Sequence, residues 1–245
     1  MTKIIQDLQE ARILLNEDPV KTEGGLSSGN AGESSNFLCY RALRLNYYAV
    51  TGLLARVCLY AGQRENAFNY STEVIKASNN GIFPFVDRSL VNGTAQDPDR
   101  IFSPEVLFAL SDSQRGELFE EYFDPSLAPN MVFRMETDLL EQTIYGGTGT
   151  GGNLDDYRCR SNWISSGSAR YFYKYSDMTE SGRIENTMIP LLRLGEMYLI
   201  AAESQSNSLA NGVSYINTLR KNRGVSNLQT LTTTLLQYEY IREVY

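Results

Sequence analysis

Two stretches in the C-terminal part of the chain constrain its fold most strongly. Residues 188–204 read Met-Ile-Pro-Leu-Leu-Arg-Leu-Gly-Glu-Met-Tyr-Leu-Ile-Ala-Ala-Glu-Ser, and residues 213–224 follow after a short loop. In each stretch apolar residues recur at steps of three and four, which is the period of an amphipathic helix. Pro190 stands where the first turn of the first helix is expected, and Gly224 ends the second. The pattern predicts two antiparallel helices, each with one apolar face.

Three more helices are predicted before residue 80, over residues 4–15, 44–61 and 64–77. Gly62 can supply the left-handed turn that joins the second of these helices to the third. Ala55 and Ala67 stand on either side of this turn, where a tetratricopeptide repeat needs small side chains so that its helices can approach closely. Any antiparallel helix pair could show the same spacing, so both interpretations stay open.

Between Asn79 and Thr187 the helical period mostly disappears. Five of the seven prolines lie in the first half of this region, and each one removes a backbone donor and resists helix continuation. Residues 105–110 are compatible with a strand, residues 132–145 with a helix, and residues 146–152 with a flexible glycine-rich loop. Long irregular regions inside a compact chain are usually functional or mobile.

Composition excludes several classes of function. The chain has no histidine, which removes the common catalytic triads and the usual zinc ligand sets. Its net charge of −7 argues against a protein that neutralises nucleic-acid phosphates. Three cysteines without a CxxC pair indicate neither a disulfide framework nor a metal site. No apolar run is long enough to span a bilayer, and the N-terminus shows no export signal. We therefore expect no cofactor and no metal.

Several stretches resemble, in the same order, the pattern of the SusD/RagB-like family, the surface nutrient-binding lipoproteins of Bacteroidetes. The match near the C-terminus, Ile-Pro-Leu-Leu-Arg-Leu-Gly-Glu-Met-Tyr-Leu-Ile-Ala-Ala-Glu, is nearly residue for residue. The family's lipoprotein signal, a further helical segment and a stretch rich in Arg and Asp are absent from this sequence. The matching stretches are residues 3–11, 46–62 with 65–67 and 74–76, 156–158, 174–175 and 189–203.

The resemblance implies a mainly α fold, in which tetratricopeptide-like helical hairpins (an α-α superhelix) support a long irregular lobe with little β structure. It implies one SusD-like unit over residues 1–245, and the pattern still running at Tyr245 suggests a piece of a longer protein. The expected parts are a helical part with a hairpin at 44–79, an irregular ligand-binding lobe and a C-terminal hairpin with a last helix; their bounds are 1–79, 80–187 and 188–245.

The function that the resemblance implies is binding without catalysis. Such a protein holds an oligosaccharide or another nutrient at the outer face of the outer membrane and delivers it to a SusC-like TonB-dependent transporter. Membrane attachment would come only through a lipid anchor that this sequence lacks. A helical-repeat module that binds only protein is the alternative, and a glycoside-cleaving enzyme is the weakest reading. The sequence does not reveal which glycan is bound.

Sugar recognition needs aromatic faces and a few polar groups, and the irregular region supplies both. We expect the ligand surface to draw on the only tryptophan and on polar and tyrosine residues around it, namely Trp163, Asn162, Arg160, Tyr145, Tyr157 and Tyr171. For each of them structural packing is the competing explanation.

Other polar residues are expected to belong to the scaffold. Arg193 and Glu196 are expected to form an intrahelical pair that also contacts the neighbouring hairpin. A second group should fasten the last hairpin to the irregular region, namely Asn217, Arg220 and Arg223. Residues 147–152 satisfy G-x-G-x-x-G but lack the strand-turn-helix context of a dinucleotide site. The neighbouring acids Asp155 with Asp156, and Glu120 with Glu121, do not meet the geometry of glycoside hydrolysis; Asp156 is a candidate partner of Arg158.

Overall fold

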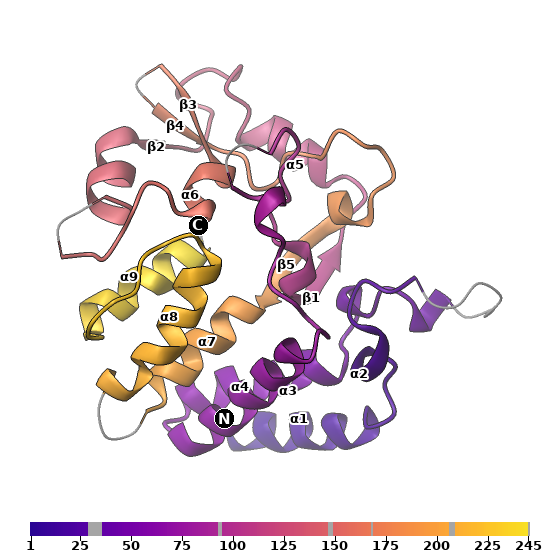
Figure 1. Ribbon diagram of the computed structural model, residues 1–245. Helices are drawn as coiled ribbons and strands as arrows, with labels where there is room; N and C mark the ends of the chain where they lie inside the picture. The colour runs from indigo at the N-terminus through magenta and orange to yellow at the C-terminus, as the bar shows by residue number, and fades with distance from the viewer. Residues whose placement is uncertain (29–35, 93–94, 147–148, 168, 206–208, 245) are drawn as a thin grey trace. The chain divides into compact units, whose positions relative to one another are not determined.

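The computed structural model describes residues 1–28, 36–92, 95–146, 149–167, 169–205 and 209–244 (Figure 1). The chain forms two compact units, each assembled from three stretches of sequence. The first unit consists of Met1–Phe85, Pro104–Leu110 and Pro190–Ile216; the second consists of Val86–Ser103, Ser111–Ile189 and Asn217–Tyr245. Among the described residues, no helix has the length and the apolar character needed to cross a bilayer.

The first unit is a stack of helices. Helix α3 packs against α1 and α4, and α4 packs against α7, so these four helices lie side by side in Figure 1. The expected hairpin over 44–79 is therefore confirmed, and the fold is mainly α as predicted. The helices are α1 (Thr2–Leu14), α2 (Val20–Glu23), α3 (Tyr47–Tyr60), α4 (Arg64–Asn79) and α7 (Leu194–Glu203), with 3-10 turns at Asn36–Leu38, Arg41–Leu43 and Leu209–Gly212.

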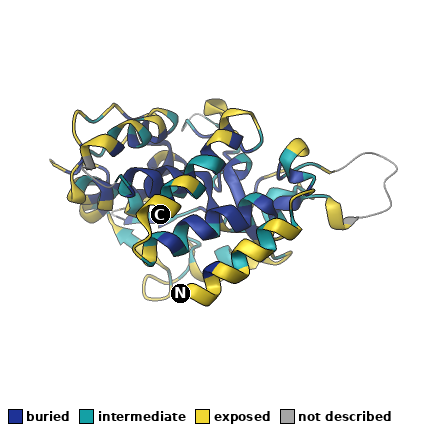
Figure 2. Cartoon of the chain, turned by 90° about the horizontal axis from the view of Figure 1, so that it is seen from below, coloured by how far each residue is buried: buried dark blue, intermediate teal, exposed yellow. Residues whose placement is uncertain are grey.

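Local chemistry explains where this hairpin begins and why it is tight. The side chain of Asn46 accepts a hydrogen bond from the Ala49 N–H at 2.9 Å, which caps α3. Gly62 follows α3 with a φ of 73°, a left-handed conformation that suits glycine. Ala55 and Ala67 are fully buried, as the prediction of close helix approach requires. Figure 2 shows the contrast between the buried positions of α3 and the mostly exposed α1, whose one buried residue is Ile5.

Ion pairs connect the helices of the first unit. Arg56 on α3 donates from Nε and Nη2 to the two carboxylate oxygens of Glu196 on α7, both at 2.6 Å. The predicted contact of Glu196 with the neighbouring hairpin is thus confirmed. The predicted intrahelical pair is not, because Arg193 is the last residue of a strand and lies before α7. Arg12 on α1 binds Glu73 on α4 through Nη2 alone, which donates to both carboxylate oxygens at 2.7 Å.

Two strands pair with each other, β1 (Val106–Ser111) and β5 (Met188–Arg193). The strand predicted over 105–110 is confirmed. The helix expected to begin around Pro190 is wrong in its start, because Met188–Arg193 is extended and α7 begins at Leu194. Pro190 has no N–H to donate, but a strand with a single neighbour in its sheet can tolerate that loss.

The second unit combines a small antiparallel sheet with short helices. The sheet has the strand order β2-β4-β3. Its strands are β2 (Arg134–Glu136), β3 (Trp163–Ser166) and β4 (Ala169–Phe172). The helices are α5 (Arg115–Tyr122), α6 (Tyr157–Asn162) and α9 (Thr233–Val244), with the π-helical turn η5 at Leu139–Ile144 and 3-10 turns at Arg88–Leu90 and Ile184–Thr187. The 3-10 turn Ser103–Glu105 begins in this unit and ends in the first, whereas α8 (Val213–Asn222) begins in the first unit and ends in this one.

The helix expected over residues 132–145 is wrong in its first half. Residues Arg134–Glu136 pair with β4, and helical structure begins only at Thr137, ahead of the π-helical turn at Leu139–Ile144. Strand pairing outweighs the weak helical period of this segment, because three backbone residues find partners on β4. The parts expected at 80–187 and 188–245 do not coincide with the units: Pro104–Leu110 contributes to the first unit, whereas Asn217–Tyr245 belongs to the second.

A buried network of charges holds the C-terminal helices of the second unit. Glu239 on α9 accepts hydrogen bonds from Arg158, Arg220 and Arg242, and Glu243 accepts from Arg158 and Arg223. Arg158 also binds Asp156, as expected from the sequence. All of these side chains are at most 5% exposed. Asn217 binds both the N–H and the C=O of Leu228.

These contacts refine the predicted role of Arg220 and Arg223. Both residues fasten the end of α8 to α9, because Arg220 binds Glu239 and Arg223, which directly follows α8, binds Glu243. Arg223 also lies over the ring of Phe102, 4.6 Å from its centroid, which links α8 to the irregular region as expected.

Candidate functional site

Four side chains of the small sheet, one of them from the predicted ligand residues, lie on the same face. Trp163 of β3 is paired with Phe172 of β4, and Met135 of β2 is paired with Arg170 of β4. Residues directly opposite each other, and residues two apart along a strand, share a face of the sheet. Trp163, Phe172, Arg170 and Met135 therefore lie on the same face. The ring centroids of Trp163 and Phe172 are 4.9 Å apart.

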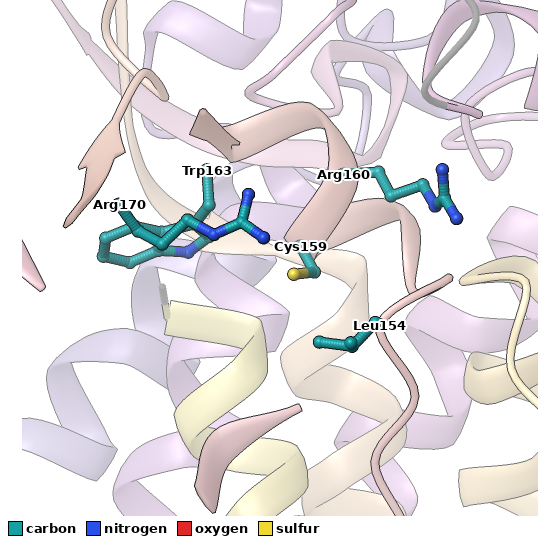
Figure 3. Close-up of a pocket in the computed structure, with 5 residues that line it drawn as sticks. All are labelled: Leu154, Cys159, Arg160, Trp163 and Arg170. Carbon is teal, nitrogen blue, oxygen red and sulfur yellow. The ribbon is translucent and has the colours of Figure 1, made fainter. Parts of the chain in front are cut away.

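One hollow on this face, the arginine hollow, has a volume of about 330 Å³ and is lined by Leu154, Cys159, Arg160, Trp163 and Arg170 (Figure 3). Arg170 is held by Glu141, to which its Nε donates at 2.8 Å, and Arg160 by Asp155. Figure 3 shows Trp163 and Arg170 at one side of the hollow and the Arg160 guanidinium extending away from them.

The thiol of Cys159 is not a reactive group in this hollow. Burial is the main cause that raises its pKa to about 12, and the charge of Asp156 raises it further. Because the thiolate is the nucleophilic form, a thiol with so high a pKa is neutral and unreactive at pH 7. Cys159 therefore packs as an apolar side chain beside Trp163, in a cluster that also contains Leu140 and Ile144.

A second hollow, the aromatic hollow, has a volume of about 370 Å³ and is lined by Phe123, Phe133, Arg134, Met135, Trp163 and Phe172. The ring of Phe123 lies 5.7 Å from that of Phe172 and 5.9 Å from that of Phe133, centroid to centroid. Phe133 is 63% exposed, so a large ring face is open to a ligand. Trp163 lines both hollows and makes them neighbours on the sheet face.

The structure brings together two of the six predicted ligand residues. Trp163 and Arg160 both line the arginine hollow. Asn162 is buried; its side-chain oxygen accepts from the Ser161 hydroxyl and its backbone C=O accepts from the Tyr173 N–H. The role of these three residues in binding stays a proposal.

The three predicted tyrosines are buried in the second unit, Tyr145 in the cluster that contains Trp163 and Cys159 and the other two elsewhere. Tyr145 is fully buried, and this burial raises its pKa well above the ordinary value. Tyr157 packs among Val86, Val91 and Phe102. Tyr171 pairs with Ile164 on β3, and the pleat turns it to the face of the sheet opposite Trp163.

The sequence reasoning missed most of the residues that line the two hollows. A hairpin signal was present, since Trp163 and Phe172 flank a Ser-Ser-Gly-Ser turn and Gly167 has a φ of 63°. That signal would have placed Arg170 on the same face of the hairpin as Trp163. Nothing in the sequence placed Phe123 and Phe133 beside them, because both lie in irregular segments far from β3.

The described residues show no arrangement for the other chemistries weighed above. They contain no group of three or more His, Cys, Asp or Glu side chains that could hold a metal ion. Glu120 and Glu121 are exposed on α5, and Asp155 is engaged by Arg160. The glycine-rich motif follows η5 rather than a strand, and its residues 147 and 148 lie outside the described part of the chain.

The helical stack, the small sheet and its two hollows define a mainly α protein with an aromatic candidate binding face. No protein-family model matches the chain, and no curated protein matches it in sequence. Solved structures do match. A protein of Bacteroides vulgatus described as sugar-binding is 22% identical with a TM-score of 0.65, over 99% of this chain and 50% of its own.

Two further matches point the same way. A SusD-like carbohydrate-binding protein of Bacteroides vulgatus is 20% identical with a TM-score of 0.60, over 98% of this chain and 48% of its own. A structure with a xylogluco-oligosaccharide is 17% identical with a TM-score of 0.60, over 98% and 52%. The chain therefore has the fold of the SusD superfamily, and it spans about half the length of these matching structures.

Proposed function

We propose that the chain is a member of the SusD/RagB-like family and binds an oligosaccharide on the sheet face that carries Trp163. The observation that carries the proposal is the pair of hollows on this face, in a fold whose solved examples include carbohydrate-binding proteins. Aromatic rings can stack on the apolar faces of sugar rings, and Phe133 offers a largely open ring for this purpose.

The proposed activity is binding and delivery rather than catalysis. The chain lacks histidine, and no carboxylate is among the described residues that line either hollow. Glycoside hydrolysis needs two carboxylates facing each other across a sugar. Release of reducing sugar ends from a polysaccharide by the purified chain would contradict this part of the proposal.

We further propose delivery to a SusC-like TonB-dependent transporter at the outer-membrane surface, with a lipid anchor on the whole protein. The helices of the first unit are the proposed contact surface, because stacked hairpins form broad and rigid faces. Co-elution of the whole protein with its purified transporter would support this contact. Separate elution of the two proteins, when each is present above about 10 micromolar, would contradict this contact, because that concentration is on the order of the dissociation constants ordinary for such assemblies.

Binding is tested by applying the chain to a glycan array and measuring the best ligand by calorimetry. Phe133→Ala should weaken binding by about 1 kcal/mol, or roughly fivefold, because it removes one stacking ring. Phe37→Ala is the matched control, since Phe37 is 62% exposed, nearly as much as Phe133, and lies in the other unit. Equal affinities for wild type and Phe133→Ala would remove the aromatic hollow from the site, and an array without any bound glycan would overturn the proposal.

A further inference from the structure

The side chains around the arginine hollow offer hydrogen-bond donors and almost no acceptors. Arg160 and Arg170 carry guanidinium groups, which only donate, and the indole of Trp163 also only donates. The remaining lining side chains are Leu154, which is apolar, and Cys159, whose neutral thiol is a weak partner. A ligand that fits this hollow must therefore bring acceptors.

Several of these donors are not used within the described part of the chain. Arg170 donates to Glu141 from Nε and Nη2, which leaves Nη1 without a protein acceptor. Arg160 donates to Asp155 from Nη2, which leaves its Nε and Nη1. The indole N–H of Trp163, a residue only 5% exposed, has no hydrogen-bond partner there either. Buried donors such as this indole N–H normally find a partner. The free guanidinium N–H groups belong to side chains that are 50% and 23% exposed, so an acceptor that enters the hollow can reach them.

The carboxylates that hold the two arginines support this arrangement. Neither Glu141 nor Asp155 is among the described residues that line the hollow. Each carboxylate therefore holds a guanidinium group without lining the hollow itself, and the remaining N–H groups of the guanidinium stay available for another acceptor. The Arg170–Glu141 pair is about three-quarters buried on both side chains, and partial burial makes a charged contact stronger than it is in water.

Sugar hydroxyl groups both donate and accept, so a neutral sugar would leave its hydroxyl protons without acceptors in this hollow. A carboxylate or a sulfate only accepts, and its oxygens match the fork of an arginine. We propose, on the basis of the oligosaccharide-binding function above, that the ligand is an acidic oligosaccharide whose anionic sugar residue occupies the arginine hollow. An uncharged neighbouring residue stacks in the aromatic hollow, on the other side of Trp163.

An array of matched glycans tests the proposal. It contains oligogalacturonates, glucuronate-bearing xylan oligosaccharides and sulfated galactans, each beside its carboxyl-reduced or desulfated counterpart. Binding of one acidic member at least tenfold tighter than its neutral counterpart supports the proposal, and the member that binds distinguishes a carboxylate from a sulfate. Binding of neutral glycans with equal or higher affinity overturns it and leaves the proposed function intact. No binding at all overturns both.

Variants of the two arginines then test whether the anionic group of the bound acidic glycan lies in the arginine hollow. Arg170→Gln and Arg160→Gln should each weaken binding at least tenfold at low salt and leave the affinity for the neutral counterpart unchanged. Arg160 is half exposed, so its replacement keeps the test valid if Arg170→Gln fails to fold. Arg88→Gln is the matched control, because it removes one exposed positive charge of the same unit outside both hollows. Equal losses in all three variants, or in none, would overturn the assignment.

Discussion

The Glu239 carboxylate offers the sharpest test of what stabilises the second unit. Its Oε1 accepts from Arg220 and, at 3.0 Å, from Arg242, and its Oε2 accepts from Arg158 at 3.1 Å. The Glu239 side chain is fully buried, and its arginine partners are at most 2% exposed. Glu239→Gln keeps the shape but removes the charge, and it turns an amide N–H₂ toward a guanidinium group.

The expected loss follows from these contacts. Removing one partner of a buried ion pair costs about 3–5 kcal/mol, because the opposite charge stays buried without compensation. With a urea dependence of about 2 kcal/mol per molar, the unfolding midpoint should fall by about 1.5–2.5 M. Here one carboxylate serves three arginines, so we expect a loss toward the upper end of this range.

The protein carries its own probe for the measurement. Trp163 is the only tryptophan, is buried, and lies in the same unit as Glu239, so its fluorescence reports the unfolding of that unit. Glu180→Gln is the control: this side chain is 75% exposed and 3.6 Å from Arg183, so its loss should change stability by less than about 0.5 kcal/mol. A Glu239→Gln midpoint within about 0.5 M of wild type would refute the reasoning.

Three further predictions concern pH, a cap and a glycine. Burial raises the pKa of Glu239 but the charges of Arg158, Arg242 and Arg220 lower it more, so its net pKa is depressed. The Glu239 carboxylate therefore contributes its full stability above the unfolded pKa of about 4.3, and this contribution is lost as pH falls through the folded pKa. Between pH 7 and pH 3 the urea midpoint should fall less in Glu239→Gln than in wild type. Asn46→Ala removes the α3 cap and a 2.8 Å hydrogen bond to the Leu107 carbonyl, at a cost of about 2–3 kcal/mol in thermal or urea unfolding followed by circular dichroism; a cost below about 0.5 kcal/mol would show that water replaces both bonds. Gly224→Ala places a Cβ about 2.5 Å from the Tyr157 ring at a φ of 75°, so the Trp163 unfolding midpoint should drop by at least about 1 M, whereas Gly182→Ala, with open space at a φ of 78°, should show only the smaller conformational cost.

The helical hairpins could be predicted from the sequence because their signal is local. Apolar residues at steps of three and four, Gly62 after α3 and small residues at Ala55 and Ala67 all act within one helix or one turn. Pro190 shows the limit of such reasoning. Its suitability for a first helical turn is a property of a few neighbouring residues, whereas its actual place in β5 depends on pairing with β1, far away in the sequence.

The candidate site was predictable only in part for the same reason. Trp163 and Arg160 could be selected as rare or polar residues of an irregular region, but the strands that place Trp163 and Arg170 on one face of the sheet are only four residues long. Strands of this length contain too few alternations of apolar and polar residues to be predicted from the sequence. The tyrosines illustrate the reverse error, since Tyr145 has the chemistry of a sugar contact but sits in a packed cluster. Residue type suggests a function, and long-range packing decides whether the side chain can perform it.

The interleaved make-up of the two units has a consequence for biosynthesis. Helix α4 leaves the ribosome early, yet α7, which packs against it, is translated only after most of the second unit's sequence has emerged. The hairpin of α3 and α4 therefore has one face uncovered while the intervening segments of the second unit are translated. Such a delay exposes a nascent chain to wrong pairings, and it makes chaperone protection during translation valuable for a protein of this design.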